Sequence, residues 1–333
     1  MLAGSWCVSR SQTQQEKSAL DLPLIRVDDA PLKAIDARLF RAIRVGDVAK
    51  VGALLAKGAN ASAQDAQNVT ALELATNAPS QSLQILQLLL SHGANINYRG
   101  LSVGSTLLIS AVVHHSANTT LIRFLLDHGA KVNDPNMHGE TPLSLAVEKG
   151  AVETVALLLQ HGANPNPANL DSFANLTFID DGQGPGFTSS GNTPVLELLK
   201  NWNPKVLDLL ATAGADLNSR DAQGFGILHY AVMSQNPDAI RILVSKGVKV
   251  NSASRRGYTS LHFAVSPPSG SIPDVEVVRA LLKAGADPSL KTDSGKTAED
   301  LLRERVKARG FVDLGNAILK DLNPSAPLFR TEK

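Results

Sequence analysis

Eight histidines are the first side chains in this sequence to consider as ligands of a metal ion. His92, His128 and His161 each follow a leucine-rich run and precede a glycine, as in LLLSHGANIN (88–97). Repeated units that stack side by side would hold these imidazoles about 10 Å apart, whereas one zinc ion needs ligand nitrogens about 2 Å away. An imidazole at a helix end instead complements the exposed carbonyl groups there. We therefore expect helix-capping histidines and no metal site.

Nucleophilic catalysis needs a nucleophile, a base and a group that orients them. Cys7 is the single cysteine and has no histidine near it in the sequence. His114 and His115 are adjacent on one expected helix and point in different directions. The motifs G-x-S-x-G and HExxH and a phosphate-cradling glycine loop do not occur, and DDGQG (180–184) lacks the spacing of a calcium loop. The sequence predicts no enzyme, no cofactor and no metal, with catalysis by residues 167–190 as the alternative.

The composition is balanced and ordinary for a folded chain. Lys and Arg number 32 against 31 Asp and Glu, which leaves a net charge of +1, and 43% of the 333 residues are hydrophobic. A nucleic-acid partner normally leaves a clustered basic footprint, and a membrane span needs about 18 or more apolar residues. Neither feature occurs, so we expect no nucleic-acid and no membrane partner. A single cysteine fits the cytoplasm, although the start MLAGSWC is loosely similar to a lipoprotein cleavage site and leaves a periplasmic location open.

Two independent markers recur along the chain. Gly-Ala-like pairs have their glycine at 58, 93, 129, 162, 214, 247 and 285. The second marker is a hexamer, with copies at TALELA (70–75), TLLISA (106–111), TPLSLA (141–146), TPVLEL (193–198), GILHYA (226–231), TSLHFA (259–264) and TAEDLL (297–302). Both markers keep a spacing near 33 residues and share one interval of 52, which predicts a repeat architecture.

The segment TPLSLAVEKGAVETVALLLQHGANPN (141–166) indicates what one unit forms. Thr141 is a good N-cap, and Pro142 at the first helical position lacks an N–H that would be unsatisfied anyway. Gly150 ends this short helix, and the apolar positions that follow give a second, amphipathic helix that Gly162 closes. Two helices of about ten residues bury too little surface alone, so neighbouring units must stack into a continuous core.

The hexamer and its period are similar to those of ankyrin repeats. The resemblance covers roughly residues 34–320 and implies an all-α solenoid of about eight stacked helix-turn-helix units with β-hairpin or turn tips. In this family the histidine of the hexamer, here His229 and His262, ties down the turn by hydrogen bonds. We expect the chain to be monomeric on its own. The predicted segments are a mostly disordered head (1–33), an ankyrin-repeat domain (34–322) with capping repeats at 34–62 and 295–322, a hairpin insertion at about 167–190, and a tail (323–333).

The 52-residue interval contains an insertion of about 19 residues at a hairpin tip. Phe173, Phe178 and Phe187 lie within it, which is unusual for a solvated loop. Apolar residues at such a place either pack back on the solenoid or contact a partner, and both interpretations stay open.

A smaller insertion, VSPPSGSIPD (265–274), lengthens the link between the two helices of the seventh repeat. Pro267 and Pro268 must end the first helix early, because proline lacks the hydrogen-bond donor and clashes with the preceding turn. We expect a rigid surface loop here, with a second contact site as the alternative.

Ankyrin-repeat proteins hold partners with hairpin tips and first helices along a concave face, so the resemblance implies a non-catalytic module that binds a protein. The tips of repeats four to seven are the favoured region, where Tyr and Arg are of the types that dominate interface hot spots. For any single residue, ordinary turn polarity or packing between repeats is the alternative. The alternative function is a dedicated inhibitor, immunity protein or host-directed effector that binds one target tightly. The contact candidates are Met137, His138, Glu140, Phe173, Phe178, Phe187, Asn192, Trp202, Gln223, Phe225, Arg255, Arg256 and Tyr258.

Overall fold

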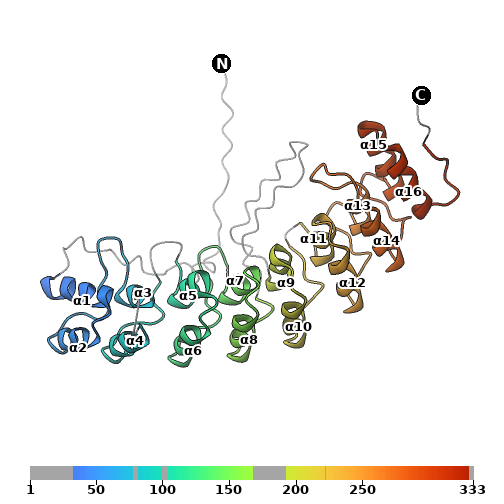
Figure 1. Ribbon diagram of the computed structural model, residues 1–333. Helices are drawn as coiled ribbons and strands as arrows, with labels where there is room; N and C mark the ends of the chain where they lie inside the picture. Colours follow the sequence, from blue (N-terminus) through green and yellow to red (C-terminus); the bar gives the residue numbers. More distant parts are fainter. Residues whose placement is uncertain (1–32, 78–81, 100–103, 168–192, 222, 330–333) are drawn as a thin grey trace, which may run out of the picture.

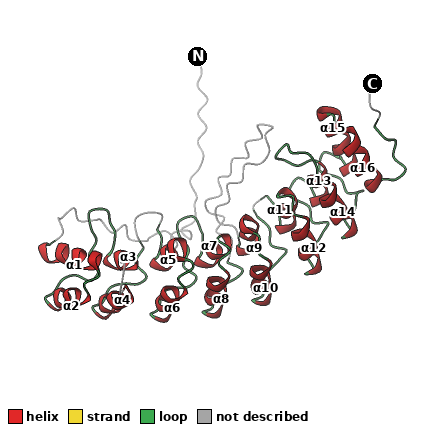
Figure 2. Cartoon of the chain, in the orientation of Figure 1, coloured by secondary structure: helices red, strands yellow, loops and turns green. Residues whose placement is uncertain are grey.

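The computed structural model describes residues 33–77, 82–99, 104–167, 193–221 and 223–329. Within these ranges the chain forms helices joined by turns, with no strand and only isolated bridges between turn residues (Figure 2). The helices form eight consecutive pairs, which confirms the expected number of units and the all-α class.

The pairs, numbered repeats one to eight, stack in one row that bends into an arc (Figure 1). First helices line the inner, concave edge and second helices the outer edge. The first helices are α1 (Ala34–Val45), α3 (Ala71–Thr76), α5 (Leu107–His115), α7 (Pro142–Glu148), α9 (Pro194–Glu197) with the 3-10 helix η2 (Leu198–Asn201), α11 (Ile227–Met233), α13 (Ser260–Val265) and α15 (Ala298–Arg309). The second helices are α2 (Val48–Ala56), α4 (Ser82–Ser91), α6 (Thr119–Asp127), α8 (Val152–Gln160), α10 (Pro204–Thr212), α12 (Pro237–Ser245), α14 (Val275–Lys283) and α16 (Val312–Leu322).

Threonine caps explain where first helices begin. Thr141 Oγ1 accepts a hydrogen bond from Ser144 N at 3.1 Å, and Pro142 fills the first helical position. Thr70 Oγ1 accepts from Glu73 N at 3.1 Å, while the Glu73 carboxylate accepts from Thr70 N at 2.8 Å. Two donors that the helix leaves unsatisfied are thereby paired at α3. The predicted threonine entry to each unit is confirmed at these two helices.

Histidine and glycine close several second helices. His92, His128 and His161 each place Nδ1 at 2.9, 2.7 and 2.9 Å from the carbonyl oxygen four residues earlier. Because a carbonyl oxygen only accepts, Nδ1 carries the proton and donates. Gly162 follows with φ at +82° and no atom within 4 Å of the position that a Cβ would take. Its backbone conformation, rather than lack of space, therefore requires glycine, and the predicted capping is confirmed.

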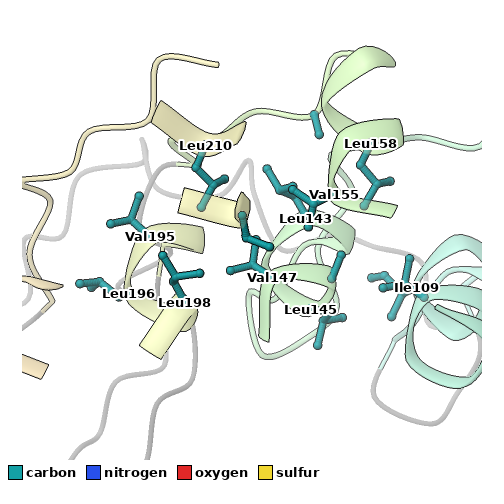
Figure 3. Close-up of a cluster of buried hydrophobic side chains, with 14 of the residues drawn as sticks. Ile109, Leu143, Leu145, Val147, Val155, Leu158, Val195, Leu196, Leu198 and Leu210 are labelled. Carbon is teal, nitrogen blue, oxygen red and sulfur yellow. The ribbon is translucent and has the colours of Figure 1, made fainter. Parts of the chain in front are cut away.

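One apolar core runs through all eight repeats. Figure 3 shows the layer around repeats four and five, where side chains of α7, α8, α9 and α10 gather. Leu143, Val155, Leu158 and Leu210 in this layer are at most 1% exposed. Each repeat completes its core with its neighbours' side chains, as expected for a stack of units that are too thin to fold alone.

Asparagine side chains join successive repeats at their outer turns. Asn97 and Asn133 each donate from Nδ2 to a carbonyl oxygen of the next repeat and accept from the backbone N–H two residues further on, at 2.7–3.1 Å. Asn166 does the same with Gly214 O at 2.8 Å and Asp216 N at 2.7 Å. Since Asn166 precedes the 52-residue interval and Gly214 follows it, repeats four and five are bonded directly across the insertion.

The predicted head (1–33) and insertion (about 167–190) lie outside the described residues, apart from Lys33 and Pro167. Four contact candidates share this position, so their roles stay predictions. They are Phe173, Phe178, Phe187 and Asn192.

The first part of the predicted tail, residues 323–329, returns onto the last repeat. Phe329 N donates to Asn316 Oδ1 at 2.7 Å, and Asn316 Nδ2 donates back to Phe329 O at 3.2 Å. The Arg303 guanidinium lies 5.3 Å from the centre of the Phe329 ring and donates to Pro327 O at 3.0 Å. These contacts cover part of α15 and α16 at the end of the stack.

Candidate interaction surface

The turn before each first helix forms the tip of its repeat, and polar side chains fix several of these tips. Asp221 Oδ1 accepts hydrogen bonds from Gln223 N at 2.9 Å and from Phe225 N at 2.8 Å. Asn136 Oδ1 accepts in the same way from the N–H groups two and four residues on, at 2.9 and 3.0 Å. Acceptors of this kind hold a turn in one conformation. These tips therefore present their outer residues from a fixed backbone.

The tips of repeats six, seven and eight bond to one another. Arg255 N donates to Gln223 O at 2.9 Å, and Asp293 N donates to Arg256 O at 3.1 Å. We call Gln223–Phe225, Arg255–Tyr258 and Thr292–Lys296 the joined tips. At Gly257, φ is +75° and a Cβ would lie 2.8 Å from Asp293 N, so the close approach admits only glycine. Backbone bonding from tip to tip makes this edge a single surface rather than three separate turns.

Aromatic rings of repeats six and seven pack against one another beneath the joined tips. Tyr258 stacks on Phe263 with ring centres 5.3 Å apart, and Phe225 meets the same ring edge-on at 5.4 Å. Phe225 is 8% exposed, so it offers a partner little surface in this conformation, and its role as a contact residue stays a prediction. Tyr258 remains half-buried, and Arg255 and Arg256 are exposed. The sequence did not distinguish these cases, because all of them occupy tip positions.

His229 and His262 hold the same region in place. His229 Nδ1 accepts from Gly226 N at 3.1 Å, and Nε2 lies 3.2 Å from Tyr258 O, to which it donates. His262 Nδ1 accepts from Thr259 N at 3.1 Å. Burial lowers the pKa of His229 to about 4, against the weaker opposing effect of the bond to Tyr258. Both imidazoles tie down their turns as the resemblance implied, and His229 also links two repeats.

The remaining described candidates do not gather with the joined tips. Met137 is 55% exposed and His138 is exposed at the tip of repeat four, so both offer surface there. Glu140 is half-buried and accepts from Asn136 Nδ2 at 2.8 Å, an internal bond of that tip. Trp202, just after η2, is half-buried against the core. Met137 and His138 thus form a second, smaller exposed tip, while Glu140 and Trp202 are partly engaged by the fold.

The described part of the chain brings together no group of three or more His, Cys, Asp or Glu that could hold a metal ion. His128 and His161 are engaged between repeats instead, with Nε2 at 2.9 Å from Gln87 Oε1 and at 3.2 Å from Asp127 Oδ1. No helix in the described ranges is both long and apolar enough to cross a bilayer. What the geometry offers is an extended surface of fixed tips.

A row of helix pairs with a shared core and bonded tips defines a class of protein, the helical-repeat solenoid. The chain belongs to the ankyrin-repeat family, because the family model for ankyrin repeats (3 copies) matches residues 99–169 and 189–292. Ankyrin repeats generally mediate protein–protein interaction. This family is the one that the hexamer and its period indicated.

Curated relatives share parts of the stack. A putative ankyrin repeat protein of fowlpox virus is 37% identical over 116 residues, which cover 34% of this chain and 33% of the relative. A plant E3 ubiquitin-protein ligase from Arabidopsis thaliana is 35% identical over 83 residues, 25% of this chain and 5% of the relative. The chain thus spans a third or less of the length of these relatives.

Solved structures agree on the fold. The ankyrin repeat domain of human ASB11 has a TM-score of 0.55 at 24% identity, covering 73% of this chain and 95% of that one. The ankyrin repeat domain of Bcl-3, a member of the IkappaB protein family, has a TM-score of 0.52 at 20% identity, covering 81% of this chain and 97% of that one. At these identities the likeness establishes the fold alone.

Proposed function

We propose that this chain is a non-catalytic module that binds a protein partner across the joined tips and the adjoining concave face. The observation that carries the proposal is the backbone bonding of three neighbouring tips, which fixes the exposed Arg255 and Arg256 beside the half-buried Tyr258. A surface that is ordered before binding loses little conformational entropy when the partner arrives.

The residue types support the same surface. Tyrosine and arginine are enriched among the few interface residues that carry most of a binding free energy. The Tyr258 ring rests on Phe263, so its exposed part is held in one orientation rather than sampling many rotamers. Asp221, through its bonds to Gln223 N and Phe225 N, fixes the backbone of the tip of repeat six at one end of this edge.

Affinity capture followed by mass spectrometry tests the proposal with a pair of matched variants. Arg255→Ala with Tyr258→Ala removes two side chains from the joined tips. Arg123→Ala with Tyr98→Ala removes the same two types elsewhere, on α6 and on the turn after α4. We expect the first variant to lose partners that the wild type and the second variant both retain, by about tenfold or more in affinity. Equal capture by all three proteins would refute the assignment of this surface.

The number of partners separates the two functions that the sequence left open. Several proteins bound at moderate affinity would favour a scaffold. One stoichiometric partner bound tightly would favour an inhibitor, immunity protein or host-directed effector.

A further inference from the structure

The loop between α13 and α14, residues 266–274, is held at two points. Gln235 Nε2, from repeat six, donates to Ile272 O at 3.0 Å. Arg305 Nη2, from repeat eight, donates to Ser271 O at 2.9 Å. The loop therefore lies between its two neighbouring repeats, and it stands out from the row beside α13 (Figure 1).

Two arginines of α15 face this loop. Arg305 bonds to it directly, and Arg309, one helical turn later, has Nη2 3.5 Å from the position that a Cβ on Gly270 would take. Within the described ranges neither guanidinium pairs with a carboxylate, although Arg303 on the same helix pairs with Glu299 at 2.8 Å. Two cations thus share one small region, and neither is in an ion pair with Asp274 at the end of the loop or with another described carboxylate.

The hydrogen bonding of Arg305 is also incomplete. Its Nε is buried and has no hydrogen-bond partner. Burial, and next the neighbouring charge of Arg309, lower the pKa of Arg305. A buried donor without an acceptor is costly, and the cost is greater for a charged group. An oxyanion beside the two guanidinium groups would supply a negative charge and further acceptors.

The loop itself carries an exposed hydroxyl next to Gly270. Ser269 is exposed, and its Oγ lies 2.8 Å from the Oγ of Ser271. It is the residue next to Gly270, which Arg309 approaches. A phosphoryl group on this hydroxyl would add a charge of about −1.5 to −2 and three acceptor oxygens. The planar guanidinium forks of arginine match the oxygens of a phosphate.

We propose that Arg305 and Arg309 form a receiving site for a phosphoryl group esterified to Ser269. In that modification Ser269 Oγ bonds to the terminal phosphorus of a nucleoside triphosphate, the bond from that phosphorus to the bridging oxygen breaks, and the nucleoside diphosphate leaves. The hydroxyl proton passes to a base of the kinase that holds the triphosphate. The phosphoserine then fastens the loop to α15 and so joins repeats seven and eight more tightly.

The test uses the full chain with phosphoserine incorporated at position 269. We expect the second ionisation of the phosphate, followed by phosphorus NMR, to occur below its usual pKa of about 6. The melting midpoint should rise by about 2 °C or more. Both effects should vanish when Arg309→Gln, a change at an exposed side chain, is combined with phosphoserine at position 269. Both should also be missing when phosphoserine is placed instead at Ser62, an exposed residue of the first repeat.

Two results would overturn the proposal. One is a phosphoserine at 269 that titrates at its usual pKa and leaves the melting midpoint unchanged or lower. The other is a rise in the melting midpoint of the unmodified chain in millimolar inorganic phosphate that equals the rise caused by phosphoserine and also depends on Arg309. The arginines would then hold a free anion.

Discussion

At the scale of single residues, the turn glycines differ in why they are needed. Gly162 has a positive φ and open space, whereas Gly257 has a positive φ and a neighbouring backbone nitrogen 2.8 Å from its missing Cβ. The first needs glycine for conformation alone, and the second needs it for conformation and for contact between tips. The sequence places both in turns and does not separate these reasons.

Replacing each glycine by alanine should measure this difference. Gly162→Ala should lower the free energy of unfolding by about 1 kcal/mol, the cost of a positive φ for a residue with a Cβ. Gly257→Ala should lower it by about 1–2 kcal/mol more, because Asp293 must also move. Urea titration followed by circular dichroism gives both values. Equal losses for the two variants would contradict the tip-to-tip packing.

The buried His229 makes stability depend on pH. Its pKa is about 4 in the folded chain against 6.5 in its ordinary state, so the unfolded chain binds more protons between these values. His229 therefore contributes up to about 3 kcal/mol to the free energy of unfolding. This contribution is fully present above pH 6.5 and is lost as the pH falls towards 4. The urea midpoint of the wild type should therefore decline over this window. His229→Gln should flatten the decline, and the exposed His114→Gln should leave it unchanged.

At the scale of elements, the sequence predicted features that depend on contacts within a few residues and missed features that depend on contacts between repeats. Thr141 and Pro142 specify a helix start through contacts within four residues, so a pattern reveals them. The burial of Phe225 depends on Phe263, which lies one repeat away. The bonds of Asn166 likewise reach Gly214 and Asp216, about 50 residues on.

Asn166→Ala tests whether these bonds carry the stack across the insertion. The change leaves Gly214 O and Asp216 N without their partner and should cost about 1–2 kcal/mol. Asn133→Ala breaks the equivalent pair at an uninterrupted junction and serves as the control. We expect denaturation of the Asn166 variant to broaden or to separate into two transitions, because repeats couple only through neighbours. A single sharp transition in both variants would show that core packing alone joins repeats four and five.

At the scale of the whole molecule, the arc has a continuous core on both sides of residues 168–192. Helices α7, α8, α9 and α10 already pack together there (Figure 3). Asn166 also bonds repeat four to repeat five across the interval. The described repeats thus complete their own interior at this junction. The two interpretations of Phe173, Phe178 and Phe187, packing back on the solenoid or contacting a partner, stay predictions, because these residues lie outside the described ranges.

Replacing these three phenylalanines by serine separates an effect on stability from an effect on binding. We expect the helical signal and the melting midpoint to stay close to the wild type while capture of the partner weakens. Phe124→Ser provides the contrast, since that ring is part of the stack and lies 4.0 Å from the imidazole of His128. Its loss should lower the midpoint by several degrees. If the triple variant melts as early as Phe124→Ser, the insertion supports the solenoid, and its aromatic residues belong to the fold rather than to an interface.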